Sequence, residues 1–558
     1  MKSNYKKILN SFLVLLLCVC FTNCNKSNTS RNKNISSATG WAINSKKGGF
    51  KYNTDFKGQE TPPNMVLVEG GTYTKGGGGT DDPIRDWNNT PNQQHVMSFY
   101  MDETEVTNIM YLEYLDWLKR TYGNSENKDL RDLYDQALPD TLVWRNKLGY
   151  SEDMVNNYLR HPAFADYPVV GVKWIQAVNF SNWRSDRYQE LILERAGYLA
   201  KGARLDSVSS SSTFSTDTYV LVPNSTYGGN TNLIRGKNSK GPDSLPPSSA
   251  SRETGLISPK FRLPTESEWE YAALGLKEVR DFNVYRGRKK YPWQGQYTRT
   301  GQRKNLGDQL ANFKNSDGDY GGIAGWSDDG ADITNQVRSY PANAFGLYDM
   351  AGNVAEWVAD VYRPIVDDEF NDFNYFRGND YKKWEITEEG VIIVGVEDMN
   401  KWTEELSSGK KVTTRLPGEI ALKNLDDNDT RYRTQFDKSY NVNFRDGDFL
   451  SSRNYNAESR ILERGSAEDT QRMYKSPSYG DSDTTKDGFQ ADPSENKTTL
   501  INDEARVYKG GSWKDRAYWL NPAQRRFYPQ DQATDFIGFR NAMSRVGAKT
   551  FSKKKSRN

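Results

Sequence analysis

The chain has 558 residues and a formal net charge of +2, with 75 basic and 73 acidic side chains. This balance lacks the basic excess that is typical of nucleic-acid-binding proteins, so that class is excluded. The 3 cysteines lie among the first 24 residues, and the chain has 2 histidines, His95 and His161. We therefore expect no disulfide, no cysteine-rich metal site and no histidine-based catalysis, and each histidine should be an ordinary surface or packing residue.

The N-terminus has the pattern of an export signal. Three lysines, Lys2, Lys6 and Lys7, precede a mostly apolar run from Ile8 to Cys20. This run is shorter than the roughly 20 apolar residues that a membrane-spanning helix needs, and no other segment of the sequence approaches that length. The sequence therefore predicts a secreted chain whose signal peptide covers residues 1–23 and whose remainder is soluble.

A cysteine closes this N-terminal region, and a polar stretch follows it. The segment Phe21–Cys24 resembles a bacterial lipobox, although Phe and Asn replace the usual Leu and small residue. We predict acylation of Cys24, with Cys20 or Cys18 as alternative sites and a plain signal peptide as the simpler alternative. A cysteine that carries more than one acyl chain is stably anchored to a membrane.

The first regular structure is expected after a polar tether. Residues 24–60 are rich in Asn, Ser, Lys and Gly, which predicts a flexible segment. The apolar run Met65–Val68, closed by a glycine turn, and the run Phe99–Asp102 predict two strands. From Glu105 to Lys119 the apolar residues recur at helical spacing, so we expect a helix there.

Three stretches have the composition of insertions. Residues 120–166 predict helices with a polar loop, and residues 205–257 are low in complexity, which predicts a loop or a disordered segment. Residues 365–505 are charged and rich in Asn and Asp. Within them Val391–Val396 predicts a strand, and the rest predicts a solvated irregular layer or, as the alternative, a surface for partners. The basic tail, residues 546–558, is expected to be disordered or to bind an acidic partner.

Two helices are predicted between these insertions. One runs from Gln176 to Arg184, after the apolar segment 169–172. The other begins at Thr265, whose side chain is expected to cap the helix, and Glu268 three residues later completes a capping box.

Several segments together resemble one family. The most specific of them are Arg262–Glu270, Phe345–Trp357, Gly510–Trp513 and Gly538–Arg540. In this order they resemble the formylglycine-generating enzymes, or sulfatase-modifying-factor family. The resemblance implies an α+β fold of the C-type-lectin-like class with much irregular structure. It also implies one discontinuous domain over residues 61–545, interrupted by the three insertions.

The resemblance carries a prediction about catalysis. The enzymes of this family oxidise a substrate cysteine with a copper-binding pair of cysteines near the C-terminus. Here the matching positions are Asp515 and Leu520, which can neither capture Cu(I) nor form a mixed disulfide. Ser512 matches the serine of the family's Gly-Gly-Ser motif, but no histidine lies nearby in the sequence to activate it. We therefore predict a pseudoenzyme that binds no copper and in which these three positions are vestigial.

The resemblance also implies two structural calcium sites, built from the hard oxygen ligands that calcium prefers. The first set comprises Asn312, Phe313 (carbonyl), Asp329 and Ala331 (carbonyl). The second set comprises Asp349, Gly352 (carbonyl), Val354 (carbonyl) and Glu356. The alternative is that these Asp and Asn side chains only form turns.

Within the family, one branch is more similar still. The lipobox, the Asn- and Lys-rich composition, the missing cysteines and the long insertions resemble the gliding-motility lipoproteins of Bacteroidetes, which serve the type IX secretion apparatus. The resemblance implies a non-catalytic scaffold in the outer membrane, facing the periplasm, that binds other envelope proteins of this machinery, including related lipoproteins. The alternatives are a glycan- or peptide-binding module and an enzyme of altered chemistry on the same fold.

Overall fold

A computed structural model describes residues 35–36, 38–45, 50, 52–53, 56, 58–77, 91–145, 149–202, 213–230, 232–234, 249–276, 289–315, 322–323, 326–327, 329–362, 379–405, 411–424, 439–446 and 505–547. The predicted acylation site Cys24, residues 548–558 of the basic tail and much of the 365–505 insertion lie outside these residues. The chain divides into two units, residues 1–58 with 250–257 and the remainder. Among the helices that are described, none has the length and apolar character needed to cross a membrane.

The first unit contains short hydrogen-bonded turns. Ile35 pairs with Ala42 in a single antiparallel bridge, so the described part of the predicted tether includes one turn. Asn53 donates a side-chain hydrogen bond to the carbonyl of Thr254 at 2.7 Å. All the helices and strands described below, except the short 3-10 helix η6 (Arg252–Thr254), belong to the second unit.

One four-stranded sheet joins segments from the whole length of the second unit. Its order is β1 (Met65–Val68), β4 (Phe99–Asp102), β19 (Ala542–Ser544) and β5 (Phe261–Arg262), and all its pairs are antiparallel. The two strands predicted at residues 65–68 and 99–102 are thus confirmed. Because β19 lies between β4 and β5, the C-terminal segment is part of the same fold as the N-terminal strands.

A second four-stranded sheet lies at the centre of the core. Its order is β17 (Arg526–Pro529), β16 (Ala505–Lys509), β8 (Ala355–Val361) and β18 (Ile537–Phe539). Strand β18 pairs with β8 in parallel, and the other neighbours are antiparallel. Alternate residues of β8 face opposite sides, as the pleat of a strand requires. Trp357 packs in one hydrophobic cluster and Val358 in another.

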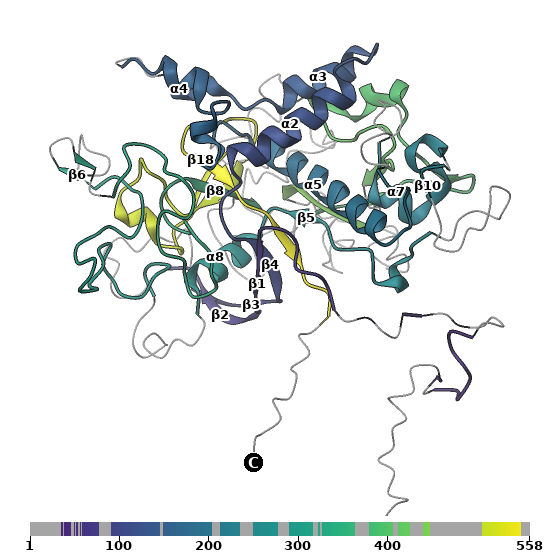
Figure 1. Cartoon of the computed structure of the whole chain (residues 1–558), viewed down its shortest axis with the longest axis horizontal. Coiled ribbons are helices and arrows are strands. Elements are labelled where there is room, and N and C mark those ends of the chain that lie inside the picture. The colour runs from purple at the N-terminus through teal and green to yellow at the C-terminus, as the bar shows by residue number, and fades with distance from the viewer. Residues whose placement is uncertain are drawn as a thin grey trace, which may run out of the picture. The chain divides into compact units, whose positions relative to one another are not determined.

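Helices cover one side of this sheet. They are α2 (Asn108–Tyr122), α3 (Lys128–Ala137) and α5 (Trp174–Arg195), which Figure 1 shows in the upper part of the molecule. Tyr111 of α2 stacks on Phe180 of α5 at 5.7 Å, and Phe180 meets Phe539 of β18 at 5.4 Å. The predicted helices are confirmed, with two differences. Helix α2 begins at Asn108, because Val106 is still extended and bonded to Phe539, and α5 continues to Arg195.

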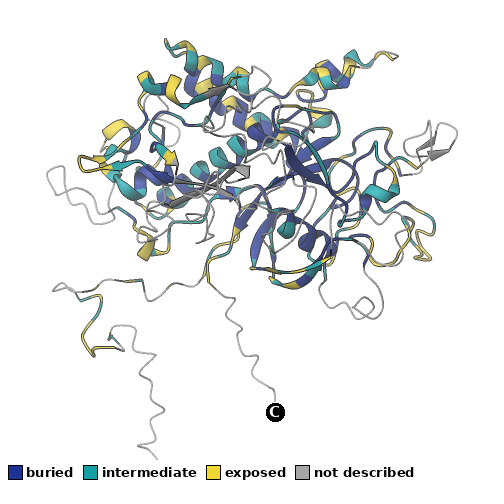
Figure 2. Ribbon diagram, turned by 180° about the vertical axis from the view of Figure 1, so that it is seen from behind, coloured by how far each residue is buried: buried dark blue, intermediate teal, exposed yellow. Residues whose placement is uncertain are grey.

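Helix α8 (Glu266–Leu274) covers the other side. The predicted capping box is confirmed: the Glu268 amide donates to Thr265 Oγ1 at 3.2 Å, and the Thr265 amide donates to Glu268 Oε2 at 3.0 Å. Trp269 of α8 packs with Val358 and with residues of β1 and β4. Figure 2 shows buried residues concentrated in the strands and on the inner faces of the helices.

The insertions are more ordered than their composition predicts. Residues 213–234 contain helix α7 (Thr216–Leu221) and the 3-10 helix η5 (Pro223–Gly229), so the prediction of a loop or disorder is wrong for this part. The described part of the 365–505 insertion contains a three-stranded sheet of β14 (Leu422–Asn424), β9 (Asn379–Trp384) and β15 (Ser439–Asp446). Hydrogen bonds to the rest of the molecule, which composition does not reveal, order these segments.

The strand predicted at Val391–Val396 is mostly wrong. Only Val391 lies in a strand, and Val396 begins the 3-10 helix η7 (Val396–Trp402). Between them Ile393 forms a single bridge to Ile420, so this apolar run packs without a continuous ladder.

The remaining elements are short. They are β2 (Gly71–Lys75), β3 (Asn92–Val96), η3 (Thr141–Trp144), α4 (Glu152–Asn157), η4 (Pro162–Phe164), β6 (Gly322–Ile323), β7 (Trp326–Ser327), β10 (Ile386–Thr387), β11 (Gly390–Val391), β12 (Thr403–Glu405), β13 (Lys411–Thr413) and η11 (Ala517–Leu520). Residues 120–166 contain helices, as predicted. The mixed α and β fold with much irregular structure is therefore confirmed.

Candidate functional site

The three vestigial positions follow β16 in a tight turn. Gly510 and Gly511 have φ values of +98° and +69°, which L side chains rarely adopt. A Cβ atom on Gly511 would lie 2.9 Å from the carbonyl oxygen of Trp519. The Gly-Gly-Ser motif is therefore required by this turn, which brings Ser512 and Asp515 close together.

Asp515 is held by a two-pronged ion pair. Arg526 Nη1 and Nη2 donate to Asp515 Oδ1 and Oδ2, each at 2.6 Å, and Ser512 Oγ donates to Oδ2 at 2.6 Å. The side chains of Asp515 and Arg526 are 13% and 18% exposed. The Arg526 guanidinium also lies over the rings of Tyr508 and Trp519, at 4.7 and 4.4 Å from their centroids. Such a bidentate, stacked ion pair is among the strongest in proteins. The side chains of Ser512 and Asp515 therefore stabilise this turn.

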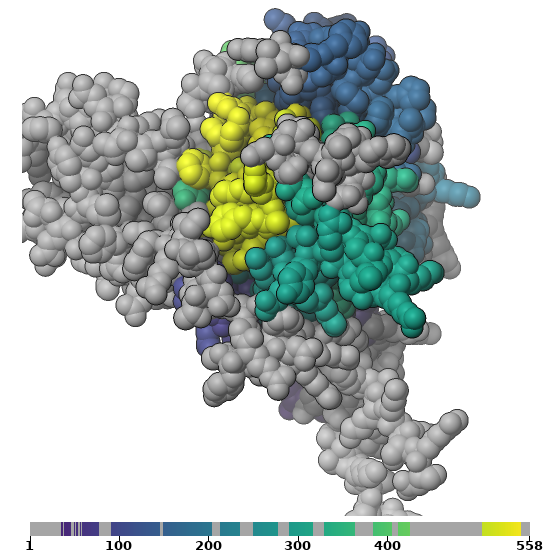
Figure 3. Space-filling view, turned by 90° about the vertical axis from the view of Figure 1, so that its left-hand side faces the viewer, coloured from purple at the N-terminus to yellow at the C-terminus, as the bar shows by residue number. Residues whose placement is uncertain are grey.

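Leu520 is a core residue. Its side chain is fully buried and packs in a hydrophobic cluster with Tyr291, Ala311, Phe313 and Ala351. Figure 3 shows the C-terminal segment beside residues of this middle part of the chain on one face of the molecule. Asp515 and Leu520 thus present no thiol or other soft ligand in this arrangement.

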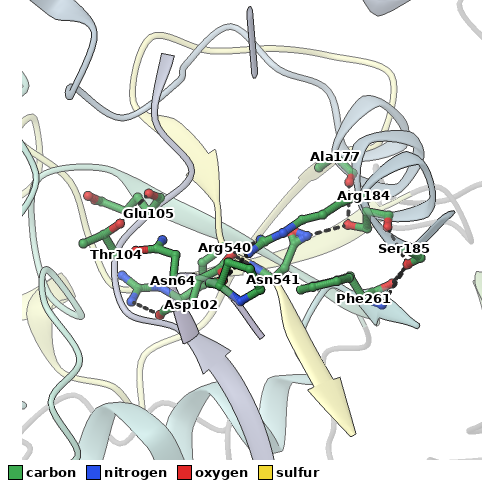
Figure 4. A network of polar contacts seen from close by, with 12 residues as sticks. Asn64, Asp102, Thr104, Glu105, Ala177, Arg184, Ser185, Phe261, Arg540 and Asn541 are labelled. Atoms are coloured by element: carbon green, nitrogen blue, oxygen red, sulfur yellow. Dashed lines mark hydrogen bonds and ion pairs between the residues drawn. The ribbon is translucent and has the colours of Figure 1, made fainter. Parts of the chain in front are cut away.

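A second polar group lies inside the molecule, where three carboxylates meet one guanidinium. Glu105 and Glu356 are fully buried, Asp349 is 6% exposed, and Arg540 is fully buried. Arg540 Nε and Nη2 donate to the two oxygens of Glu356 at 2.7 and 2.6 Å. Figure 4 shows Arg540 next to Asn541 and Asp102, and Asp102 also accepts hydrogen bonds from Arg184 (2.7 Å) and the Asn541 amide (2.9 Å).

This group has more negative than positive charge, because three carboxylates face one guanidinium. Burial raises the pKa of Glu105 well above its usual value, and the charges of Asp349 and Glu356 raise it further. Burial likewise raises the pKa of Asp349 to about 6. Added positive charge, from protons or a cation, would reduce this excess of negative charge.

Asp349 fits a cation ligand. Its Oδ2 accepts a hydrogen bond from the Arg338 amide at 2.9 Å, whereas its buried Oδ1 has no hydrogen-bond partner. Asp349, Gly352 and Asn353 have φ values of +55°, +80° and +58°, so the segment is a tightly wound turn. An unpartnered buried carboxylate oxygen is what a calcium ion would satisfy.

Glu356 fits less well. Besides Arg540, the indole of Trp269 donates to Glu356 Oε2 at 2.7 Å, so both carboxylate oxygens are already bonded. Gly352 and Val354 lie in the same turn and at the start of β8. The structure thus brings the second predicted ligand set into one segment, and a calcium ion would share the Glu356 carboxylate with Arg540.

The first predicted ligand set also comes together. Asp329 Oδ2 accepts from the Phe313 amide at 3.0 Å, and Oδ1 accepts from the Ala331 amide at 3.1 Å. Asn312 Nδ2 donates to the Ile333 carbonyl at 2.6 Å. These bonds are those of a turn. Across the described residues, His, Cys, Asp and Glu side chains do not form a group of three or more that could hold a metal ion by themselves.

Sequence reasoning missed the residues that connect the two sets. Asn353 accepts from the Asn335 amide at 2.8 Å and donates to Glu105 Oε2 at 3.0 Å, and its own amide donates to the Asn312 carbonyl at 2.9 Å. Arg540 lies in the family segment 538–540, and Glu105 and Arg540 are each a charged residue beside an apolar one. That pattern is a signal for a buried charge, but it does not identify the partner.

A network of two carboxylates and three cations lies next to this group. Glu266 contacts Lys75 at 3.3 Å, Lys509 at 3.4 Å and Arg525 at 2.8 Å, and Glu270 contacts Lys509 at 3.2 Å. The nearby cations hold the pKa of Glu266 well below its usual value despite its burial. The two histidines are elsewhere: His95 Nδ1 is 3.3 Å from Thr72 Oγ1, and His161 caps η4.

Comparison with known proteins identifies a matching domain family and several relatives. The model of the sulfatase-modifying factor enzyme 1-like domain family matches residues 52–408. The serine/threonine-protein kinase pkn1 of Chlamydia caviae is 24% identical over 302 residues, which are 53% of this chain and 28% of that protein. The inactive C-alpha-formylglycine-generating enzyme 2 of Mus musculus is 33% identical over 111 residues, 19% of this chain and 28% of that protein.

Among solved structures, PvdO from Pseudomonas aeruginosa aligns with a TM-score of 0.35 and 14% identity, covering 89% of this chain and 100% of PvdO. The chain covers 28% of the length of each of the two sequence relatives. The family match ends at residue 408, but strands β16 to β19 of residues 505–544 complete both four-stranded sheets.

Proposed function

The chain belongs to the sulfatase-modifying-factor family, and we propose that it is a non-catalytic member that acts as a lipid-anchored scaffold of the gliding-motility and type IX secretion machinery. One observation carries the non-catalytic part: Asp515 and Leu520 stand at the positions of the catalytic cysteines, and Arg526 and the core already engage them. The name of the mouse relative states that this family includes an inactive protein.

An activity assay tests the loss of catalysis. The mature full-length protein is incubated with Cu(I), oxygen and a cysteine-containing peptide that an active family member converts, with that active enzyme as the control. We expect the peptide cysteine to remain unmodified, because no thiol is available to bind copper or the substrate. Conversion of the cysteine to formylglycine by this chain would contradict the proposal.

The scaffold role rests on similarity to one branch of the family. The segment Gly40–Asn44, the chain length and the insertions resemble GldJ, a gliding-motility lipoprotein of Bacteroidetes. Under this proposal the partners are other envelope proteins of the gliding and type IX secretion machinery, including related lipoproteins. Ordered insertions support it, since they give this chain surfaces beyond the shared family core.

Cys24 is the proposed anchor, with the protein in the outer membrane and facing the periplasm. In the Cys24→Ala variant we expect the protein to leave the membrane fraction, because the acyl chains are lost. Fractionation of cells that are fed a labelled fatty acid measures both location and acylation. If the variant stays with membranes and still incorporates label, the anchor lies elsewhere; Cys20→Ala and Cys18→Ala then identify the site.

Calcium is the proposed structural cofactor. Asp349, with the carbonyls of Gly352 and Val354 and a shared Glu356, would hold one ion. Asn312, Asp329 and the carbonyls of Phe313 and Ala331 would hold the other. The support is the unpartnered Oδ1 of Asp349 and the excess of three carboxylates over Arg540. A bound ion would add positive charge and tie down turns in a fold with few long ladders.

A further inference from the structure

A small cavity lies where the insertions meet the helical layer. It has a volume of about 50 Å³ and is lined by residues of α2, α3 and α5 together with residues from the segments 213–214 and 413–419. The lining combines four aromatic rings, two carboxylates and one guanidinium. These residues are Tyr114, Trp117, Trp183, Phe214, Asp186, Glu419 and Arg187.

The two insertions close the cavity by holding each other in place. Thr213 Oγ1 donates to the Pro417 carbonyl at 3.1 Å, and Thr218 Oγ1 donates to the Gly418 carbonyl at 2.6 Å. The backbone at residue 413 is tied to the helical layer, because its amide donates to Gln136 Oε1 at 3.0 Å. The cavity is therefore a built feature, formed from three separate parts of the chain.

The aromatic wall suits a cation. The rings of Tyr114 and Trp183 lie 5.3 Å apart, and Trp183 lies 6.5 Å from Trp117. Trp117 already has a cation on its face, since the Arg187 guanidinium carbon lies 4.9 Å from its ring centroid. Aromatic faces attract positive charge through their quadrupoles, most strongly where water is excluded.

Four carboxylates lie around the cavity, and three of them have a cationic partner. Three carboxylates have ion pairs: Glu190 with Arg187 at 2.9 Å, Glu419 with Arg415 at 3.2 Å, and Asp217 with Lys260 at 2.6 Å. Among the residues that the structure describes, Asp186 has no ion pair. Its Oδ1 accepts only from Thr216, at 2.9 Å from the amide and 2.7 Å from the hydroxyl. Burial raises the pKa of Asp186 to about 6, which reflects the cost of an unpaired charge there.

We propose that this cavity binds the ammonium end of a lysine side chain that a partner protein presents, with Asp186 as the counter-ion and the rings of Trp183 and Tyr114 around the methylenes. The size agrees: about 50 Å³ is room for roughly three to five waters, which matches an ammonium group and a few methylenes. A sugar ring with its hydroxyls is too large. The site does not depend on the proposed role in secretion.

Matched peptides test the charge requirement. The full-length mature protein is titrated with acetyl-Gly-Lys-Gly-amide and with the same peptide carrying norleucine, which keeps the methylenes and lacks the ammonium, and binding is followed by saturation-transfer NMR. We expect the lysine peptide to bind and the norleucine peptide to bind at least about tenfold more weakly. Equal binding of the two, or no binding of the lysine peptide at millimolar concentration, would overturn the proposal.

Variants test the location. Asp186→Asn keeps an oxygen that accepts from Thr216 but removes the charge, and we expect it to weaken lysine-peptide binding by at least about tenfold. Asp116→Asn, on the same helical layer with a side chain 61% exposed, is the matched control and should bind like the wild type. If Asp186→Asn fails to fold by circular dichroism, Trp183→Phe replaces it and should weaken binding severalfold. An unchanged affinity in a folded variant at either position would overturn the proposed site.

Discussion

Asp515 and Asp186 are two aspartates that lie among aromatic rings, but they differ in their ion pairing. Asp515 receives two hydrogen bonds from Arg526, whose guanidinium is stacked on Tyr508 and Trp519. Asp186 also lies among rings, and Lys260 and Arg187 are near it, but it forms no ion pair in the described part of the chain. A carboxylate with a partner inside the chain stabilises the fold, whereas one without a partner costs free energy until something outside supplies the charge.

This difference distinguishes an aspartate with a structural role, Asp515, from one with a proposed binding role, Asp186. Around Asp515 the polar groups bond to one another, and the proposed function takes this region as a former catalytic corner. The region around Asp186 combines the helical layer with segments of two insertions, and Asp186 makes no ion pair among the described residues. An aspartate among aromatic rings is therefore ion-paired within the chain at residue 515, whereas at residue 186 it is proposed to bind a cation from outside.

The largest effect is expected for Arg526→Ala. It leaves the Asp515 charge 13% exposed and without its partner, so the free energy of unfolding should fall by roughly 2–4 kcal/mol. Denaturant titration measures the change. The control is Arg120→Ala, which breaks an exposed pair with Asp116 and should cost at most about 1 kcal/mol.

A double variant sharpens this prediction. Arg526→Ala with Asp515→Ala removes both charges, and it should recover part of the stability that the single variant loses. If Arg526→Ala lowers the free energy of unfolding no more than Arg120→Ala does, the Asp515–Arg526 pair does not stabilise the fold. The contrast between Asp515 and Asp186 would then be wrong.

A smaller effect of opposite sign is expected for Asp186→Asn without ligand. An acid whose pKa is raised in the folded state favours folding at low pH, and that advantage is lost as pH rises from about 3.9 to about 6. The groups that face Asp186 are Lys260, Glu419, Arg187 and Thr216. The variant should therefore gain roughly 1–3 kcal/mol at pH 8 and little at pH 4. Unfolding free energies at both pH values, with Asp116→Asn as control, measure this. A variant that is less stable than the wild type at pH 8 would show that Asp186 is paired.

The smallest effect is expected for removal of calcium, which concerns a third buried aspartate, Asp349. A ligand at ten times its Kd stabilises the folded state by about 1.4 kcal/mol, so a chelator should lower the melting temperature measurably. Asp349→Asn should reduce the response to calcium, whereas Asp116→Asn should not. A melting temperature that is the same in chelator and in excess calcium would remove the calcium proposal.

The sequence allowed the local elements to be predicted where the pattern was strong. The capping box of Thr265 and Glu268 and the helix that contains Tyr111 follow from short-range rules. The assignment of Asp515 and Leu520 to the positions of the catalytic cysteines rests on the family's spacing and stays a prediction. Each of these predictions depends on residues that are near one another in the chain or in a recognised motif.

The long-range partners could not be predicted. Arg526 lies 11 residues from Asp515, and Glu105 lies 248 residues from Asn353, so no local pattern connects them. The order of the insertions was missed for the same reason. Polar composition predicts a solvated loop, but bonds such as Thr218 to Gly418, 200 residues apart, hold these segments in place.

The central claim, a non-catalytic scaffold, is tested most directly by purification of the full-length protein from cross-linked native membranes, followed by mass spectrometry. We predict recovery with motility or secretion components at constant ratios, with cross-links that involve the insertions. Recovery of the chain alone in a monodisperse form would contradict the scaffold.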